Sequence, residues 1–111
     1  MLAVDLVRER VGALNAAPKM KTDRETGVEV QAVDRETGIA QWTVQALHSP
    51  KEGKATLLNV TVTSEFEPEI QPMVTGFASL EVDMYTIKEN GVIKGAGLWF
   101  RGELDTQGVD Q

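Results

Sequence analysis

Hydrophobic and polar residues alternate along much of the chain. The alternation is clearest over residues 28–33, 40–46, 56–63 and 77–86. A period of two is typical of β-strands that bury one face and expose the other. The pattern therefore predicts four strands, and the last of them turns Leu80, Val82 and Met84 inward.

The pentapeptide Asp-Arg-Glu-Thr-Gly occurs twice, at residues 23–27 and 34–38. An Asp that begins a turn can accept a hydrogen bond from the backbone ahead of it, and a Gly that ends the turn can adopt the left-handed conformation. Two such turns around a short alternating segment predict an up-down-up meander with a further strand near residues 18–22. Their parity predicts the following opposite pairs: Ala32 with Ala40, Val30 with Trp42, Val28 with Val44, and Met20 with Val30.

Asn90-Gly91 marks a second hairpin and allows two registers. A two-residue loop would set Asp83 opposite Leu98 and Glu81 opposite Phe100, which places acids beside apolar side chains. A three-residue loop with a bulge instead pairs apolar residues with one another, and we favour it. The pairs that it predicts are Val82 with Leu98, Leu80 with Phe100, Met84 with Ala96, and Glu81 with Trp99.

The two remaining segments are less regular. Residues 1–16 fit either a helix or a strand, and we favour a short helix or arm that leads into a strand near residues 11–16. Residues 64–76 contain Pro68 and Pro72 and predict an irregular crossing. The expected fold is all-β, a small antiparallel Greek-key barrel of OB-like type over residues 1–104, followed by a flexible acidic tail over residues 105–111.

Composition limits the function classes. The chain has 111 residues, no Cys and a net charge of −6, so we expect one domain without disulfides and no general phosphate-coating role. No apolar run reaches membrane-spanning length, and charged residues from Asp5 to Arg10 replace the apolar stretch of a secretory peptide, so we expect a cytoplasmic protein. Acids cluster in a predicted solvated loop and a predicted tail: Glu65, Glu67, Glu69, and Glu103, Asp105, Asp110.

No residue pattern predicts catalysis. His48 is the only histidine, and without Cys or a second His it reads as a loop residue rather than a metal ligand or general base. The acids of the repeated turns lack the later ligands of a calcium loop. We therefore expect a protein that is not an enzyme and that has no metal site and no cofactor.

A polar sheet face with aromatic residues offers a different chemistry. Exposed aromatic rings stack on unpaired bases, and basic side chains meet phosphates. The candidate nucleic-acid-binding residues are Trp99, Arg101, Tyr85, Lys94 and Lys54. In the alternative interpretation the N-terminal segment covers Trp99, and Arg101 pairs with Glu81 or Asp83. Trp42, Phe77 and Phe100 are expected to pack in the core or at a barrel end.

Four short motifs carry a resemblance: residues 18–19, 34–38, 42–44 and 97–102. Together they resemble small OB-like proteins of bacterial conjugative plasmids, integrative elements and phages that bind single-stranded DNA or assist replicative helicases. The resemblance implies a non-catalytic accessory role in DNA replication, with single-stranded DNA and a replication protein or helicase as partners. The competing reading is a protein-interaction or phage structural module that uses an edge strand or the aromatic face to assemble with itself or with a partner.

Overall fold

The protein consists of β-strands and turns. The computed structural model describes residues 2–6, 10–49 and 53–105, and these residues contain no helix. The strands within them are β1 (Leu2–Ala3), β2 (Arg10–Pro18), β3 (Met20–Thr22), β4 (Glu29–Gln31), β5 (Gln41–Ser49), β6 (Thr56–Thr63), β7 (Phe77–Glu89) and β8 (Val92–Leu104). The all-β expectation is confirmed, and each predicted strand has a counterpart.

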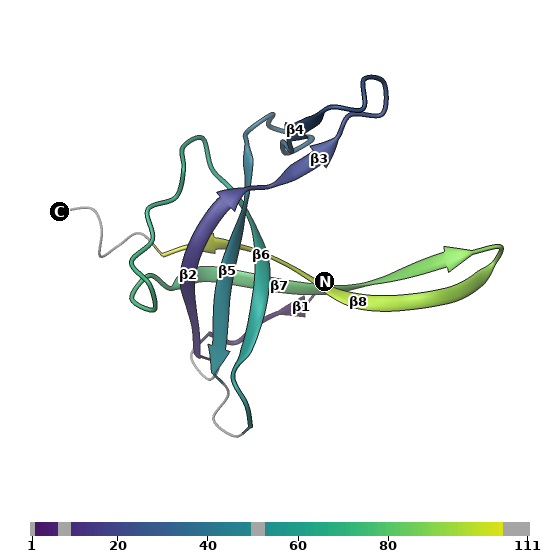
Figure 1. Ribbon diagram of the computed structural model, residues 1–111. Helices are drawn as coiled ribbons and strands as arrows, with labels where there is room; N and C mark the ends of the chain where they lie inside the picture. The colour runs from purple at the N-terminus through teal and green to yellow at the C-terminus, as the bar shows by residue number, and fades with distance from the viewer. Residues whose placement is uncertain (1, 7–9, 50–52, 106–111) are drawn as a thin grey trace.

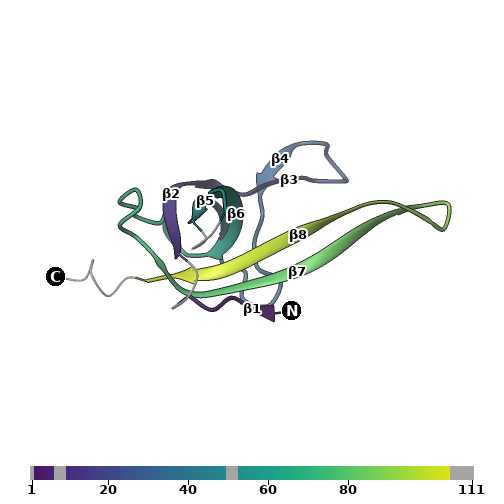
Figure 2. The same ribbon diagram turned by 90° about the horizontal axis from the view of Figure 1, so that it is seen from below.

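The main sheet has the order β1-β7-β8-β6-β5-β2 and curls into a half-barrel (Figures 1 and 2). Neighbouring strands are antiparallel except β6 and β8, which run parallel and pair through Val60 with Phe100 and Thr61 with Arg101. The irregular crossing after β6 makes this possible, because it places β7 two strands away from β6 and leaves the position between them for β8. The crossing predicted from Pro68 and Pro72 is therefore confirmed.

The core lies inside the curl. Val44 and Val60 oppose each other on β5 and β6, and both are fully buried. The other buried core residues are Ala13, Ala46, Val62, Phe77 and Leu80, with Phe100 and Leu104 partly buried against them. Trp42 is half-buried at one end of β5. The core or barrel-end placement expected for Trp42, Phe77 and Phe100 is confirmed.

The crossing also helps to close the half-barrel. The Ala13 backbone N–H donates to the Thr75 carbonyl at 2.9 Å, and the Met73 N–H donates to the Ala13 carbonyl at 2.8 Å. Thr75 is buried, and its hydroxyl accepts a hydrogen bond from the Gln71 N–H at 2.9 Å. These bonds tie β2 to the crossing where no strand completes the wall.

The described part of the N-terminal segment contains the short strand β1 and no helix. β1 pairs with β7, with Leu2 opposite Val82 and Ala3 opposite Glu81. The strand expected over residues 11–16 is confirmed as β2, which extends further in both directions and bulges between Ala13 and Asn15. The helical alternative for the described part of residues 1–16 is wrong: Val4, Leu6 and Val11 pack against the core without forming a helix, and Ala13 is fully buried in β2.

The repeated pentapeptides form two matching turns. Gly27 and Gly38 have φ values of 74° and 73°, and each donates its N–H to the carbonyl of the Asp four residues earlier at 2.8 Å. The Asp23 carboxylate accepts from the Glu25 N–H, and the Asp34 carboxylate accepts from the Glu36 N–H, both at 2.9 Å. The predicted turn chemistry is confirmed.

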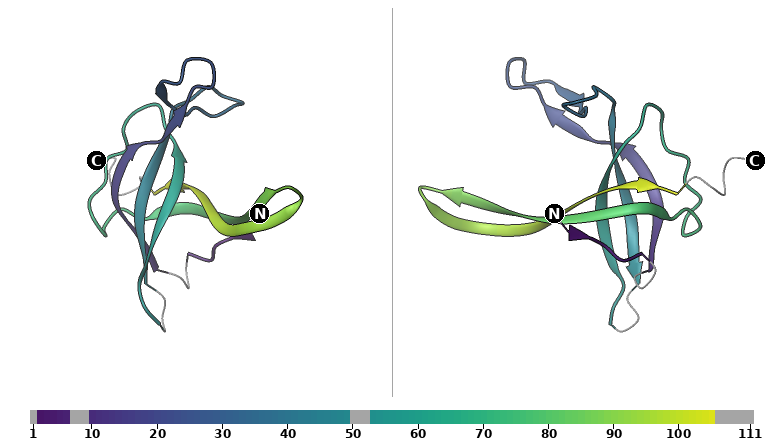
Figure 3. Two further views of the ribbon diagram at one scale, coloured as in Figure 1. Left: turned by 45° about the vertical axis from the view of Figure 1, so that its right-hand side comes forward. Right: turned by 180° about the vertical axis from the view of Figure 1, so that it is seen from behind.

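The strand pairing around these turns differs from the prediction. β3 and β4 form a separate two-stranded sheet that projects from the barrel (Figure 3), with Met20 opposite Gln31. The flanks of the second turn are connected by a β-bridge between Val33 and Ala40 and by backbone hydrogen bonds, one of which runs from the Gln41 N–H to the Ala32 carbonyl at 2.9 Å. β5 pairs with β2 and β6 instead, and the predicted contacts of Val28 and Val30 with β5 are wrong because both side chains are exposed on the projecting hairpin.

The turn between β7 and β8 is a two-residue loop. Asn90 and Gly91 have φ values of 53° and 78°, and Glu89 lies opposite Val92. Two consecutive positive φ angles define the type I′ turn that suits the twist of a hairpin. The three-residue loop that the sequence favoured is wrong.

A bulge in β8 makes the two-residue loop compatible with apolar cross-strand pairs. Lys88 lies opposite Ile93, whereas Ile87 lies opposite Gly95, so Lys94 is an extra residue in the ladder. The register shifts by one, so that Val82 and Met84, on the face that continues the core, again oppose apolar side chains. The resulting pairs are Leu80 with Gly102, Val82 with Phe100, Met84 with Leu98, Asp83 with Trp99, and Glu81 with Arg101.

The outer half of this hairpin leaves the barrel. β1 pairs with β7 up to Val82, and β6 pairs with β8 from Phe100 onward. Between these points residues 83–99, called the arm below, pair only with one another among the described residues and extend away from the sheet (Figures 1 and 2). Met84 is 68% exposed and Leu98 is 62% exposed, so their predicted place in the core is wrong.

The described chain ends at Asp105, directly after the last residue of β8. The Asp105 N–H donates to the Gly76 carbonyl at 2.9 Å, which fastens this end to the start of β7. The rest of the tail predicted over residues 105–111 lies outside the described residues. No helix long and apolar enough to cross a membrane occurs in the described part of the chain.

Candidate functional site

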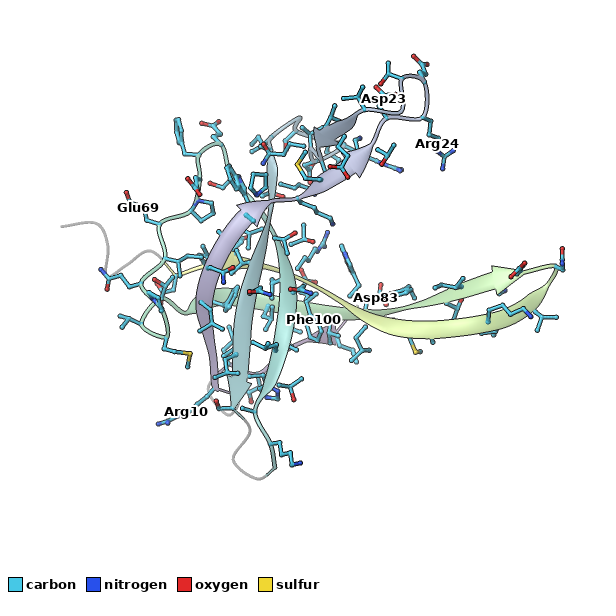
Figure 4. The ribbon with its side chains drawn as sticks, viewed as in Figure 1. Arg10, Asp23, Arg24, Glu69, Asp83 and Phe100 are labelled. Carbon is cyan, nitrogen blue, oxygen red and sulfur yellow. The ribbon has the colours of Figure 1, made fainter. Side chains whose placement is uncertain are left out.

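Three of the five candidate residues share one face of the β7–β8 hairpin. Trp99 and Arg101 come from β8 and Tyr85 from β7, and their odd positions place them on the same side of the ladder. Trp99 lies opposite Asp83 at the root of the arm, where Figure 4 labels the acid. The structure therefore brings Trp99, Arg101 and Tyr85 together, although in a different register from the predicted one.

The Arg101 side chain contacts both Trp99 and Glu81. Its guanidinium carbon lies 5.8 Å from the centroid of the Trp99 ring, within range of a cation–π interaction. Its Nε lies 3.4 Å from a carboxylate oxygen of Glu81, directly across the ladder. Both side chains of this ion pair are about half exposed, so the pair adds little to stability. The pairing with Glu81 that the sequence offered as an alternative is present.

Tyr85 is held against a glycine. A Cβ atom built on Gly97 would lie 2.5 Å from the Tyr85 hydroxyl oxygen, which means that the ring covers the glycine backbone. Ile87 covers Gly95 more loosely, with its Cδ1 4.0 Å from the corresponding position. On this face of the arm, the Tyr85 ring thus packs on the arm's own backbone.

Lys94 and Lys54 lie away from this cluster. Lys94 is the bulge residue near the arm tip, seven positions from Arg101, which is roughly 23 Å along a strand. Lys54 precedes β6, whose first residue Thr56 is five positions from the Thr61 that pairs with Arg101, or roughly 17 Å. Neither lysine joins the aromatic residues to form one basic surface.

A groove of about 720 Å³ runs beside Trp99 and Arg101, between β6, β8 and the crossing. Its titratable lining comprises six carboxylates and one guanidinium: Asp34, Glu67, Glu69, Glu81, Glu103, Asp105 and Arg101. Apolar contacts come from Phe66, Pro68 and Leu104, and Figure 4 shows Glu69 on the crossing. The groove is strongly acidic, and like charge repels phosphate groups.

Two side chains near the groove, Asp34 and Lys19, have pKa values below their ordinary ones. Hydrogen bonds from the backbone N–H groups of Thr37 and Glu36 lower the pKa of Asp34, because they stabilise the carboxylate. Partial burial lowers the pKa of Lys19, whose Nζ donates to the Thr61 hydroxyl at 2.9 Å. The Asp34 carboxylate thus serves mainly to stabilise its own turn, and the Lys19 side chain is hydrogen-bonded to β6.

The crossing is held in place by Trp42. Its indole N–H donates to the Ser64 carbonyl at 2.9 Å, and the Ser64 hydroxyl donates to the Phe66 carbonyl at 2.7 Å. These contacts position the acidic wall of the groove. Within the described ranges, no three His, Cys, Asp or Glu side chains are grouped so that they could hold a metal ion.

Sequence reasoning missed the acidic groove and the free arm. The separate acidic clusters were visible, but the sequence does not reveal that the crossing brings Glu67 and Glu69 to the wall that Glu103 completes. The signal for the arm was the length of the hairpin. β7 and β8 each have 13 residues, which is more than the nine of β5.

Comparison of the chain with protein-family models, with curated proteins and with solved structures finds no match.

Proposed function

We propose that the protein is a non-catalytic interaction module that docks on another protein through its arm. The observation that carries this proposal is the uncovered apolar side of the arm. Met84, Leu98 and Ile93 are each more than half exposed there, although they continue the side of the hairpin that faces the barrel core. An isolated two-stranded ribbon is marginal in water, and exposed apolar surface of this kind marks a binding site.

Site-specific crosslinking tests this proposal. A photo-reactive amino acid in place of Met84 should form adducts with protein in cells that express the chain. The same amino acid in place of Leu57 is the matched control, because Leu57 is 61% exposed but lies on β6 of the barrel. Adducts at position 84 and none at position 57 support the proposal. Equal yields at the two positions, or none at either, contradict it.

Single-strand DNA binding is the second candidate function, in keeping with the resemblance to replication accessory proteins of mobile elements. Its support is the shared face of Trp99, Tyr85 and Arg101, which would offer two stacking rings and one phosphate contact. The acidic groove and the engagement of Arg101 by Glu81 weigh against it. For these reasons it ranks below the interaction module.

Titration of a labelled mixed-sequence oligonucleotide at low salt tests this second candidate. If it is right, the single strand binds more tightly than its duplex, and Trp99→Ala removes roughly 1 to 3 kcal/mol of affinity. Arg101→Ala should reduce the salt slope by about one contact, while Lys21→Ala, on the separate β3–β4 hairpin, should leave the slope nearly unchanged. Equal losses from Trp99→Ala and Lys21→Ala would reject the stacking face.

We further propose that the half-barrel is an OB-like Greek-key fold. The support is the order of the long strands, β2-β5-β6-β8-β7, with β8 returning to lie parallel to β6 after the crossing. A partly open five-stranded barrel is typical of that fold. Proton–proton contacts in the parallel pattern between Val60 and Phe100, measured by NMR, test the arrangement.

A further inference from the structure

The groove beside Trp99 carries most of the protein's unbalanced charge. Its lining holds six carboxylates and the guanidinium of Arg101, and thus a net charge of −5, whereas the whole chain carries −6. The remainder of the chain is therefore close to neutral. Like charges gathered in one hollow repel one another, so a cationic occupant would stabilise the groove.

The carboxylates are spread along the groove. Glu67 and Glu69 lie two positions apart on the crossing. Glu103 and Asp105 lie two positions apart at the end of β8 and directly after it. Side chains at alternate positions of an extended peptide are about 7 Å apart, which matches acids two positions apart on an extended wall. Since no three acids in the described ranges are grouped for a metal ion, this spread favours a linear polycation.

Some of these acids have no cation beside them. Glu81 pairs with Arg101, and the Asp34 carboxylate accepts hydrogen bonds from its own turn. Other lining carboxylates form no ion pair with any basic residue of the described chain: Glu67, Glu69 and Glu103. Their charges are free to meet the basic groups of a partner.

Arg101 shows how the groove can hold a cation. Its guanidinium carbon lies 5.8 Å from the centroid of the Trp99 ring, and its Nε lies 3.4 Å from the Glu81 carboxylate. Phe66 offers a second ring on the crossing, next to Glu67, and is 78% exposed. Lys and Arg side chains pack their aliphatic stems on such surfaces and keep their charged ends near acids.

The groove has room for several residues of an extended chain. The wall formed by residues 99–105 is roughly 20 Å long at about 3.3 Å per residue. An extended segment of about seven residues spans that length. A segment of this size can set basic side chains against the crossing and against β8 at the same time.

We propose that the groove binds a short, extended peptide segment of another protein that carries several Lys or Arg residues. Charge complementarity along the groove identifies this occupant, and Phe66 and Trp99 pack against the stems of its basic side chains. The groove is separate from the apolar side of the arm. The inference therefore goes beyond the proposed docking function and does not depend on it.

Fluorescence anisotropy at low salt with a labelled octapeptide of alternating lysine and alanine residues tests the proposal. We expect saturable binding of this peptide and much weaker binding of a glutamate–alanine octapeptide. The double variant Glu67→Gln/Glu69→Gln should bind the lysine peptide about fivefold more weakly. The control Glu25→Gln/Glu29→Gln removes the same charge from exposed positions of the β3–β4 hairpin and should bind like the wild-type chain.

A pair of variants without a charge change locates the peptide. Phe66→Ala should weaken binding at least about threefold, because it removes apolar contact area from the groove. Leu57→Ala removes an exposed side chain of β6 that does not line the groove, so it should bind like the wild-type chain. Thermal melts establish that each variant is folded.

Three results would overturn the proposal. The wild-type chain could fail to bind the lysine peptide at submillimolar concentration. Equal losses in the two double variants would mean that the overall charge attracts the peptide without a specific site. A folded Phe66→Ala variant with wild-type affinity would reject the groove as the binding site. Crosslinking from position 84 is a separate measurement, so each of these results leaves the docking function of the arm standing.

Discussion

The ring of Tyr85 covers the backbone of Gly97 across the arm, so closely that no side chain fits at position 97. Gly97→Ala should therefore push the ring outward, and because Tyr85 is already exposed on one side, the ring can move without unfolding the barrel. We expect a change in unfolding free energy below about 1 kcal/mol. Tyr85 is the only tyrosine, so its NMR ring signals report the displacement directly.

Gly95→Ala is the matched control for that experiment. Its new Cβ would meet Ile87 at 4.0 Å, an ordinary van der Waals distance. The tyrosine signals should stay in place in this variant. Ring signals that move equally in both variants, or in neither, would contradict the placement of Tyr85 on Gly97.

Leu80 and Leu98 should respond very differently to truncation. Leu80 is 2% exposed in the core, so Leu80→Ala should cost about 2 to 5 kcal/mol through lost burial and the cavity that remains. Leu98→Ala should cost less than about 1 kcal/mol, because the side chain is exposed on the arm. Chemical denaturation measures both. A reversed ranking would mean that the arm folds back onto the barrel.

The left-handed glycine of the second turn should resist substitution for conformational reasons alone. A Cβ on Gly38 meets nothing within 4 Å, but its φ of 73° is unfavourable for any side chain. Gly38→Ala should lower the unfolding free energy by about 1 to 2 kcal/mol. Gly76→Ala, which also meets open space but has no positive φ, should be nearly neutral in the same thermal melts. Equal losses in the two variants would contradict the conformational explanation.

Asp34 should make folding sensitive to acid. Its pKa is lowered in the folded protein by the Thr37 and Glu36 N–H groups, so the folded state binds fewer protons than the unfolded chain. The resulting stabilisation is fully present above the ordinary Asp pKa of about 3.9 and is lost as the pH falls through the lowered folded value. NMR titration should place the Asp34 midpoint below 3.9. Asp34→Asn, which keeps an acceptor but does not titrate, should melt with a flatter pH dependence in this window.

The sequence was most informative where local chemistry decides the structure. The turn of residues 34–38 could be predicted in detail, because Asp34 and Gly38 act within five residues of chain. The strands at β5 and β6 followed from alternation, since both pack one face on the core. These features depend on near neighbours or on a single buried face.

Pairing and exposure depend on distant parts of the chain, and there the predictions failed. Met84 alternates like a core residue, yet alternation does not reveal where the barrel ends and the arm begins. The bulge at Lys94 shifts the register that a two-residue loop would set. A prediction that includes only the loop or only the bulge therefore gives the wrong cross-strand pairs. For the candidate site, the common face of Trp99 and Arg101 followed from parity, whereas the acidic wall beside them arises only when the crossing folds over β6.

The parallel pairing of β6 with β8 has a consequence for how the protein folds. Val60 and Phe100 are neighbours in the sheet but are separated by 40 positions in the sequence, so their contact requires a long loop to close first. During synthesis β6 emerges well before β8, and its edge stays unpaired until residue 100 has left the ribosome. We therefore expect the meander of β2, β5 and β6 to form early and the closure by β8 to limit the folding rate, with the open edge of β6 as the point most vulnerable to misassembly in the interval.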